Sequence, residues 1–105
     1  MHKSYRPEYY EAIIQIRPNE QEVLEFVESQ LKNRKDLFVS KVIKKKFGTD
    51  FYISSQKFAR SLGKKLKEKF EGELKASKTL HGRDRQKSTL LYRSTICFKV
   101  KQEDL

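Results

Sequence analysis

The segment from Leu80 to Lys87 gathers side chains that could hold a phosphate backbone. It lies between two strand-like runs and carries three cations, one histidine and one carboxylate: Arg83, Arg85, Lys87, His81 and Asp84. Gly82 lets the backbone turn, and the planar fork of an arginine binds phosphate oxygens in pairs. The spacing favours a basic loop that grips a phosphate backbone, although an ordinary solvated loop can have the same composition.

Catalytic and metal chemistry have little support in these residues. His81 and Asp84 could exchange a proton with a substrate, but no nucleophile or second acidic group accompanies them in sequence. The chain has one cysteine, Cys97, and two histidines, which is too few for a structural zinc site. Its four glycines are isolated, so neither common glycine-rich phosphate loop is present. The sequence therefore predicts a protein that is not an enzyme and uses no metal or cofactor.

The net charge points to a polyanionic partner. The chain has 24 Lys and Arg residues against 14 Asp and Glu, a net charge of +10, which favours nucleic acid through counterion release and electrostatic steering. Residues 1–50 hold 10 basic and 8 acidic side chains, whereas residues 51–105 hold 14 and 6. The partner is therefore expected to meet the second half of the chain.

One predicted helix in that second half has a basic face. At about 100° per residue, four cations fall on one arc, opposite an apolar arc: Lys57, Arg60, Lys64 and Lys67. An ordinary solvated face remains an alternative, because Lys64 and Lys67 can pair with acids one turn further on. The expected nucleic-acid site consists of these four residues together with Lys78, His81, Arg83, Arg85 and Lys87.

Length and hydropathy predict one domain without a membrane anchor. The 105 residues suffice for one well-cored domain, and seven Phe and five Tyr residues supply large buried areas. No apolar run approaches the roughly 18 residues of a membrane span, and the N-terminus lacks the apolar stretch of a signal peptide. We therefore expect a cytoplasmic location and no membrane partner.

Hydrophobic periodicity predicts the first four elements. Alternation predicts a half-buried strand over residues 10–17, and helical spacing predicts a helix up to about residue 34 with Asn19 as its N-cap. Runs at 37–43 and 51–53 are predicted to form a hairpin.

The remaining elements complete an α+β domain. A second helix follows Ser54 and Ser55, both plausible N-caps, and stops before Gly72. Alternating residues at 74–80 and 90–100 predict a second hairpin around the basic loop. The order βαββαββ favours a ferredoxin-like two-layer sandwich, with two helices on one face of a mainly antiparallel sheet.

Four weaker features concern the predicted sheet. Lys44–Lys46 could contact phosphates, but lysines at a strand edge more commonly block aggregation. Phe51 or Tyr52 could stack a base, but core packing is the favoured interpretation. Tyr9 could be exposed on the open side of the sheet, although no second aromatic residue is clearly paired with it. Cys97, within an alternating strand, is interpreted as a packing residue.

Three segments carry a resemblance to a known family. The segments Phe51–Arg60, Lys75–Gln86 and Tyr92–Thr95 resemble the archaeal branch of the nonsense-mediated-decay-protein-three family, adaptors for export of the large ribosomal subunit. The similarity covers nearly the whole chain, and the segment Leu80–Gln86 is its most distinctive part. Family members also carry CxxC zinc modules and a barrel region, which these 105 residues lack. The resemblance therefore implies one domain excised from a longer multidomain protein.

The resemblance implies a non-enzymatic domain that binds the large ribosomal subunit during maturation. Together with the basic loop and helix, it leads to the hypothesis that the domain recognises the phosphates and shape of folded ribosomal RNA. The alternative is a protein-docking module that binds ribosomal proteins or a sister domain.

Overall fold

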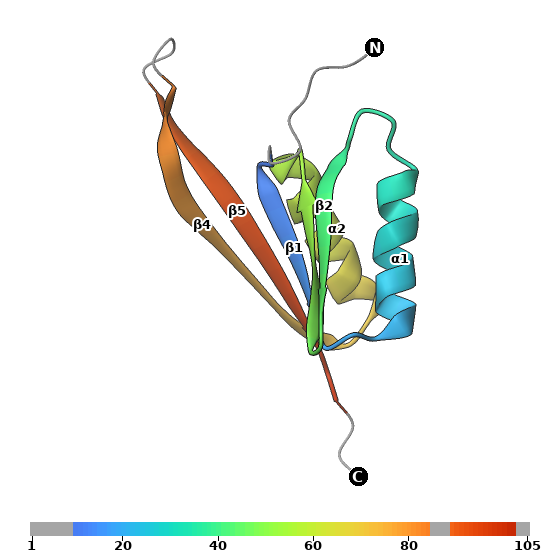
Figure 1. Ribbon diagram of the computed structural model, residues 1–105. Helices are drawn as coiled ribbons and strands as arrows, with labels where there is room; N and C mark the ends of the chain where they lie inside the picture. Colours follow the sequence, from blue (N-terminus) through green and yellow to red (C-terminus); the bar gives the residue numbers. More distant parts are fainter. Residues whose placement is uncertain (1–9, 85–88, 103–105) are drawn as a thin grey trace.

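The computed structural model describes residues 10–84 and 89–102, and for His81, Arg83–Asp84 and Thr89–Leu91 it describes the backbone alone (Figure 1). The elements follow the predicted order. They are β1 (Ala12–Arg17), α1 (Gln21–Lys32), β2 (Val39–Lys45), β3 (Gly48–Ile53), α2 (Gln56–Lys69), β4 (Gly72–Asp84) and β5 (Thr89–Val100). The predicted α+β class is confirmed.

The five strands form one mixed sheet in the order β2-β3-β1-β5-β4. Three pairings are antiparallel, whereas β1 and β5 run parallel at the centre of the sheet. The first half of the chain has the expected split βαβ arrangement, because β3 lies between β1 and β2.

The expected ferredoxin-like order is wrong for the second half of the chain. In that fold the strand after the second helix would lie beside β1, but here β5 takes this place and β4 is the edge. The inward residues of β5 include Ile96 and Phe98, which are fully buried, whereas the corresponding positions of β4 include exposed Lys78. The more apolar strand therefore occupies the centre, and the lysine-bearing strand lies at the edge.

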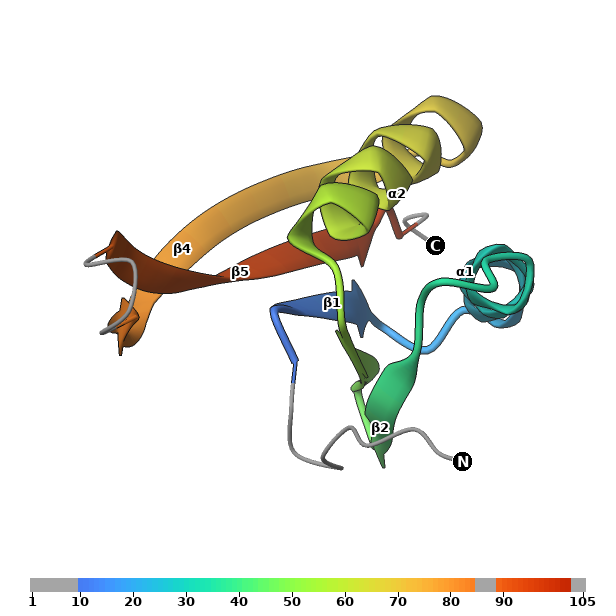
Figure 2. The same cartoon turned by 90° about the horizontal axis from the view of Figure 1, so that it is seen from above.

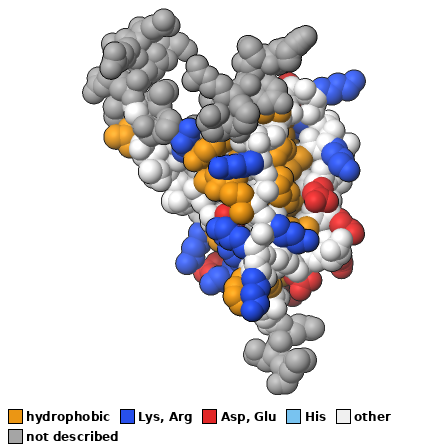
Figure 3. Space-filling model, in the orientation of Figure 1, with side chains coloured by type: hydrophobic (Ala, Val, Ile, Leu, Met, Phe, Trp, Pro, Cys, Tyr) orange, Lys and Arg blue, Asp and Glu red, His pale blue; other side chains and the backbone are white. Residues whose placement is uncertain are grey.

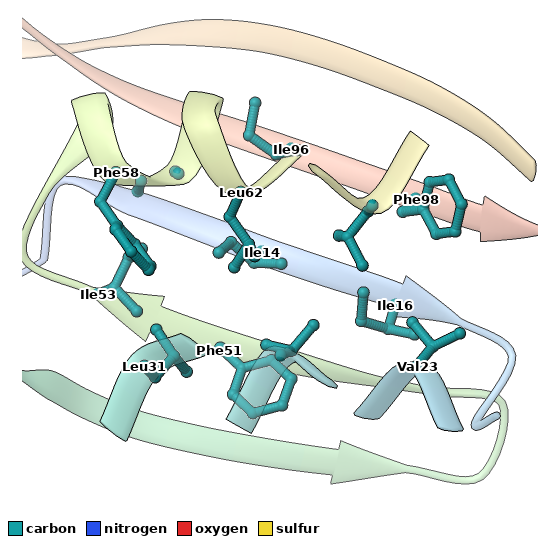
Figure 4. Close-up of a cluster of buried hydrophobic side chains, with 14 of the residues drawn as sticks. Ile14, Ile16, Val23, Leu31, Phe51, Ile53, Phe58, Leu62, Ile96 and Phe98 are labelled. Atoms are coloured by element: carbon teal, nitrogen blue, oxygen red, sulfur yellow. The ribbon is translucent and has the colours of Figure 1, made fainter. Parts of the chain in front are cut away.

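Both helices cover the same face of the sheet, as expected (Figure 2). In β1 the alternate residues Ala12, Ile14 and Ile16 are fully buried, while their neighbours are only half-buried. Figure 4 shows side chains of both helices, including Leu31 and Leu62, among those of the strands. The core therefore lies on one side of the sheet, and the other side is uncovered by any described element.

The two helices begin in different ways. Ser55 is the N-cap of α2, since its Oγ accepts a hydrogen bond from the backbone N–H of Phe58 at 3.1 Å. The expected Asn19 cap of α1 is wrong, because the N-cap is Glu20 and makes no side-chain cap bond. Asn19 instead donates to the carbonyl of Lys45 at 2.8 Å and accepts from the Thr49 hydroxyl at 2.6 Å. It thus ties the loop after β1 to the β2–β3 turn.

Candidate nucleic-acid interface

The basic face of α2 is fixed by close packing of the opposite face. Phe58, Leu62 and Leu66 are buried. Gly63 lets the helix approach β5 closely, because a Cβ there would lie 3.0 Å from Cγ2 of Ile96. The predicted cations of the helix are all exposed: Lys57, Arg60, Lys64 and Lys67. The helix therefore points a row of cations away from the core, as the sequence predicted.

The local ion pairs that would neutralise this face are not formed. Lys64 makes no ion pair with Glu68, and Lys67 makes none with Glu71, although the structure describes all four residues. The nearest acids along the helix therefore leave these lysines available to an external anion.

Two predicted site residues from different elements meet beside α2. Arg60 of α2 and Lys78 of β4 line a shallow cavity of about 190 Å³ on the helix side of the sheet. Its other lining residues are Ala76, Ser77, Ser94 and Ile96. The β4–β5 strands form the floor, so the two cations flank a small hollow between α2 and the edge of the sheet.

The predicted basic loop is shorter than expected. Strand β4 continues to Asp84, with a register shift between Leu80 and Gly82, so much of the expected loop is strand. The β4–β5 hairpin extends beyond the rest of the sheet as an arm (Figure 1). Of the predicted loop residues, His81 and Arg83 lie on β4, with no described side chains, and Arg85 and Lys87 lie outside the described residues. A phosphate grip at the tip of the arm stays a prediction.

The open face of the sheet, which we define by the strand residues pointing away from both helices, holds features that sequence reasoning missed. Two rows of paired residues cross its middle, each with one residue from every strand in the order β2-β3-β1-β5-β4. The first row is Lys41, Tyr52, Ile13, Thr95 and Ser77. The second row is Ile43, Asp50, Gln15, Cys97 and Lys75. Figure 3 shows hydrophobic side chains gathered over the strands, with Lys and Arg side chains around them. Phe51 is buried in the core as expected, but its neighbour Tyr52 belongs to the open face.

Four side chains form a stacked series at one end of the open face. The rings of Tyr10 and Tyr52 meet edge to face with centroids 4.8 Å apart. The guanidinium carbon of Arg93 lies 3.9 Å from the Tyr10 centroid, and Nζ of Lys41 lies 4.6 Å from that of Tyr52. Cations over aromatic rings are attracted by the ring quadrupole. Tyr10 and Tyr52 therefore form an aromatic pair that the sequence did not predict, while Tyr9, the residue considered for this side of the sheet, lies outside the described residues.

A buried carboxylate neutralises part of the positive charge on this face. Asp50 is 2% exposed, and its carboxylate lies 2.8 Å from Nη2 of Arg17 and 3.3 Å from Nζ of Lys45. Burial of an unpaired carboxylate is costly, so the two cations stabilise it in place. Arg17 and Lys45 are therefore engaged within the fold, unlike the cations of α2.

A larger apolar cavity of about 890 Å³ lies where β1, β4 and β5 meet the β2–β3 turn. Phe47 lines it and is 71% exposed, an unusual position for a large aromatic side chain. Lys99 and Lys101 lie on the same rim. This cavity does not include any residue of the predicted site.

The fold and its surface define a small, strongly basic α+β domain. Residues 9–100 match the family described as NMD3, second domain, so the chain belongs to the NMD3 family and the resemblance is confirmed. A search of curated proteins found no match to the chain. Membership implies a role in export or maturation of the large ribosomal subunit, and the family's adaptors are non-catalytic. None of the helices in the described ranges is long and apolar enough to cross a membrane.

Proposed function

We propose that this domain contacts phosphates of folded ribosomal RNA in the large ribosomal subunit. The observation that carries the proposal is the meeting of Arg60 and Lys78 at one shallow cavity. Neither side chain forms an ion pair with a described acid. Two such cations from separate elements suit a phosphate, because the arginine fork binds two oxygens and the lysine adds a point charge.

Further cations extend this contact in two directions. Lys57, Lys64 and Lys67 continue along α2 and attract RNA diffusely. His81 and Arg83 lie on β4 in the projecting arm, and Arg85 and Lys87 follow them in the sequence. These four residues form the second contact of the proposal. Phosphate contacts position a protein without reading sequence, so the domain recognises the shape of the RNA.

The wider setting of the proposal follows the family. We infer that residues 1–105 form one domain of a longer adaptor of the archaeal branch and that the adaptor works in the cytoplasm. The family match over residues 9–100, which is described as a second domain, supports a place in a longer adaptor.

The test is the salt dependence of binding to purified large-subunit RNA. Each phosphate contact adds about one unit to the slope of log K against log salt, so Arg60→Gln with Lys78→Gln should lower the slope by about two units. Lys32→Gln with Lys35→Gln removes the same charge from exposed positions at the end of α1 and just after it, and is the matched control. Equal slopes for both double variants would exclude the proposed cavity.

A second candidate function is protein docking, and the exposed Phe47 at the large apolar cavity favours it. In that case an acidic ribosomal protein or a sister domain would bury the ring. Ribonuclease treatment of the subunit distinguishes the two functions, because co-sedimentation that survives it requires a protein contact. Phe47→Ser should then abolish co-sedimentation, whereas competition by free RNA would favour the phosphate contact.

A further inference from the structure

The open face has a small cavity beside the Arg93–Tyr10 stack. It measures about 190 Å³, and its lining consists of Tyr10, Ile13, Thr79, Leu80, Arg93 and Thr95. A cavity of roughly 150 Å³ accommodates benzene in another protein, so this space suits one flat ring system and is too small for a peptide segment. The cavity therefore has room for one small group, such as a single ring system.

The chemistry of the lining matches a nucleobase. The guanidinium of Arg93 is held in place, because its Nε donates to the carbonyl oxygen of Tyr10 at 3.1 Å while its carbon lies 3.9 Å from that ring's centroid. Splayed RNA bases stack on aromatic rings and on guanidinium planes. Ile13 and exposed Leu80 supply apolar walls. The cavity thus combines a stacking plane with apolar contacts.

Two hydroxyls complete the match. Thr79 and Thr95 line the cavity, and neither side chain makes a hydrogen bond to another described residue. A threonine hydroxyl can donate and accept, so the pair can meet the mixed donors and acceptors at the edge of a base. An apolar side chain of a protein partner would leave both hydroxyls unused.

The charge around the cavity favours a nucleotide over a neutral ring. Among the strand residues whose side chains the structure describes, outward positions carry six cations and two acids, namely Arg17, Lys41, Lys45, Lys75, Arg93 and Lys99 against Asp50 and Glu73. Asp50 is already neutralised by Arg17 and Lys45. The remaining positive charge can hold the phosphates on either side of an inserted base.

We propose that this cavity binds one unstacked base of single-stranded RNA. The proposal rests on RNA being the partner of the domain, but it uses a different surface from the Arg60–Lys78 cavity. Lys78 and Thr79 are consecutive residues of edge strand β4, and they line the two cavities on opposite sides of the sheet. An RNA segment that passes around this edge can place a phosphate at the first cavity and a base in the second.

The test compares two fluorescein-labelled oligonucleotides about ten nucleotides long, one with bases and one abasic, at equal phosphate count. Wild type should bind the strand with bases roughly tenfold more tightly, as expected for one stacked base. Arg93→Lys keeps the charge but removes the stacking plane, so it should abolish this preference without changing the salt slope. Arg60→Lys is the same chemical change at the other cavity and should keep the preference.

A second variant keeps the test valid if Arg93→Lys fails to fold. Thr79→Val with Thr95→Val preserves shape while removing both hydroxyls, and should lower the preference for bases several-fold. Equal binding of the two oligonucleotides by wild type would overturn the base site, whatever the result for the Arg60 and Lys78 variants. If the preference for bases depends on Arg93 while Arg60→Gln with Lys78→Gln leaves the salt slope of RNA binding unchanged, the base site is supported. The proposed phosphate contact at the Arg60–Lys78 cavity is then excluded.

A protein partner is the remaining outcome. If neither oligonucleotide binds at about 50 mM salt while the chain still co-sediments with ribonuclease-treated subunits, the domain binds a protein and not RNA. That result would overturn the proposal.

Discussion

Nη2 of Arg17 lies 2.8 Å from Oδ1 of Asp50, and the acid is almost wholly buried although it belongs to the open face of the sheet. The two residues are in adjacent strands, β1 and β3, and Lys45 of β2 approaches the other carboxylate oxygen. One carboxylate therefore links three neighbouring strands on the side that no described helix covers.

Arg17→Met should destabilise the fold by about 2 kcal/mol, because it leaves a buried carboxylate with only one cation. Lys45→Met is the matched control and should cost less, since the Lys45 side chain is 55% exposed and its contact is longer. Urea unfolding measures both. Equal losses would mean that the two cations contribute alike to holding Asp50.

Ser55→Ala should lower the free energy of unfolding by about 1 kcal/mol, because it removes the cap hydrogen bond to the Phe58 N–H. Ser61→Ala is the control within the same helix, where Ser61 is exposed. Alanine favours a helix interior, so the control should be neutral or slightly stabilising. Thermal unfolding of the two variants would contradict this account if Ser61→Ala were the more harmful.

Gly63→Val should destabilise by about 2–3 kcal/mol, because its side chain would meet Ile96 and Leu74 where α2 packs on the sheet. Ser61→Val places the same side chain on the exposed side of α2 and should cost only a few tenths of a kcal/mol more than alanine there. The comparison separates crowding against the strands from the lower helix propensity of valine. Chemical denaturation of both variants provides the measurement.

Arg83→Ala with Arg85→Ala should weaken binding to large-subunit RNA and lower the salt slope by about two units. The prediction depends on the charge of the projecting arm and requires no side-chain geometry. Lys32→Ala with Lys35→Ala removes equal charge at a distance along the chain and should leave the slope nearly unchanged. An affinity and slope equal to those of wild type in the arm variant would exclude the arm from the interface.

Local periodicity in the sequence was enough to predict the seven elements. The alternation of Ala12, Ile14 and Ile16 and the helical spacing of Phe58 and Leu62 depend only on which face each element buries. The basic arc of α2 was predictable for the same reason. These features need no knowledge of which strand pairs with which.

Strand order and the open face depend on contacts between distant residues, and sequence patterns do not specify them. The partner of β1 is β5, whose inward residues Ile96 and Phe98 are buried, and both candidate strands lie far from β1 in the sequence. Tyr10 and Tyr52 meet because β1 and β3 are adjacent and their register pairs Tyr52 with Ile13, three residues after Tyr10. Asn19 looked like a helix cap because its real partners, Lys45 and Thr49, lie across the β2–β3 turn.

The position of β5 beside β1 has a consequence for the synthesis of this chain. Strand β1 is made first and pairs with β3 early, but its second neighbour is the last strand in the sequence. Pairing between distant segments is slow because the intervening chain must be closed into a loop. A nascent chain therefore exposes one edge of β1 until nearly all of the domain has been translated. Closure of the sheet then marks the completion of the whole domain.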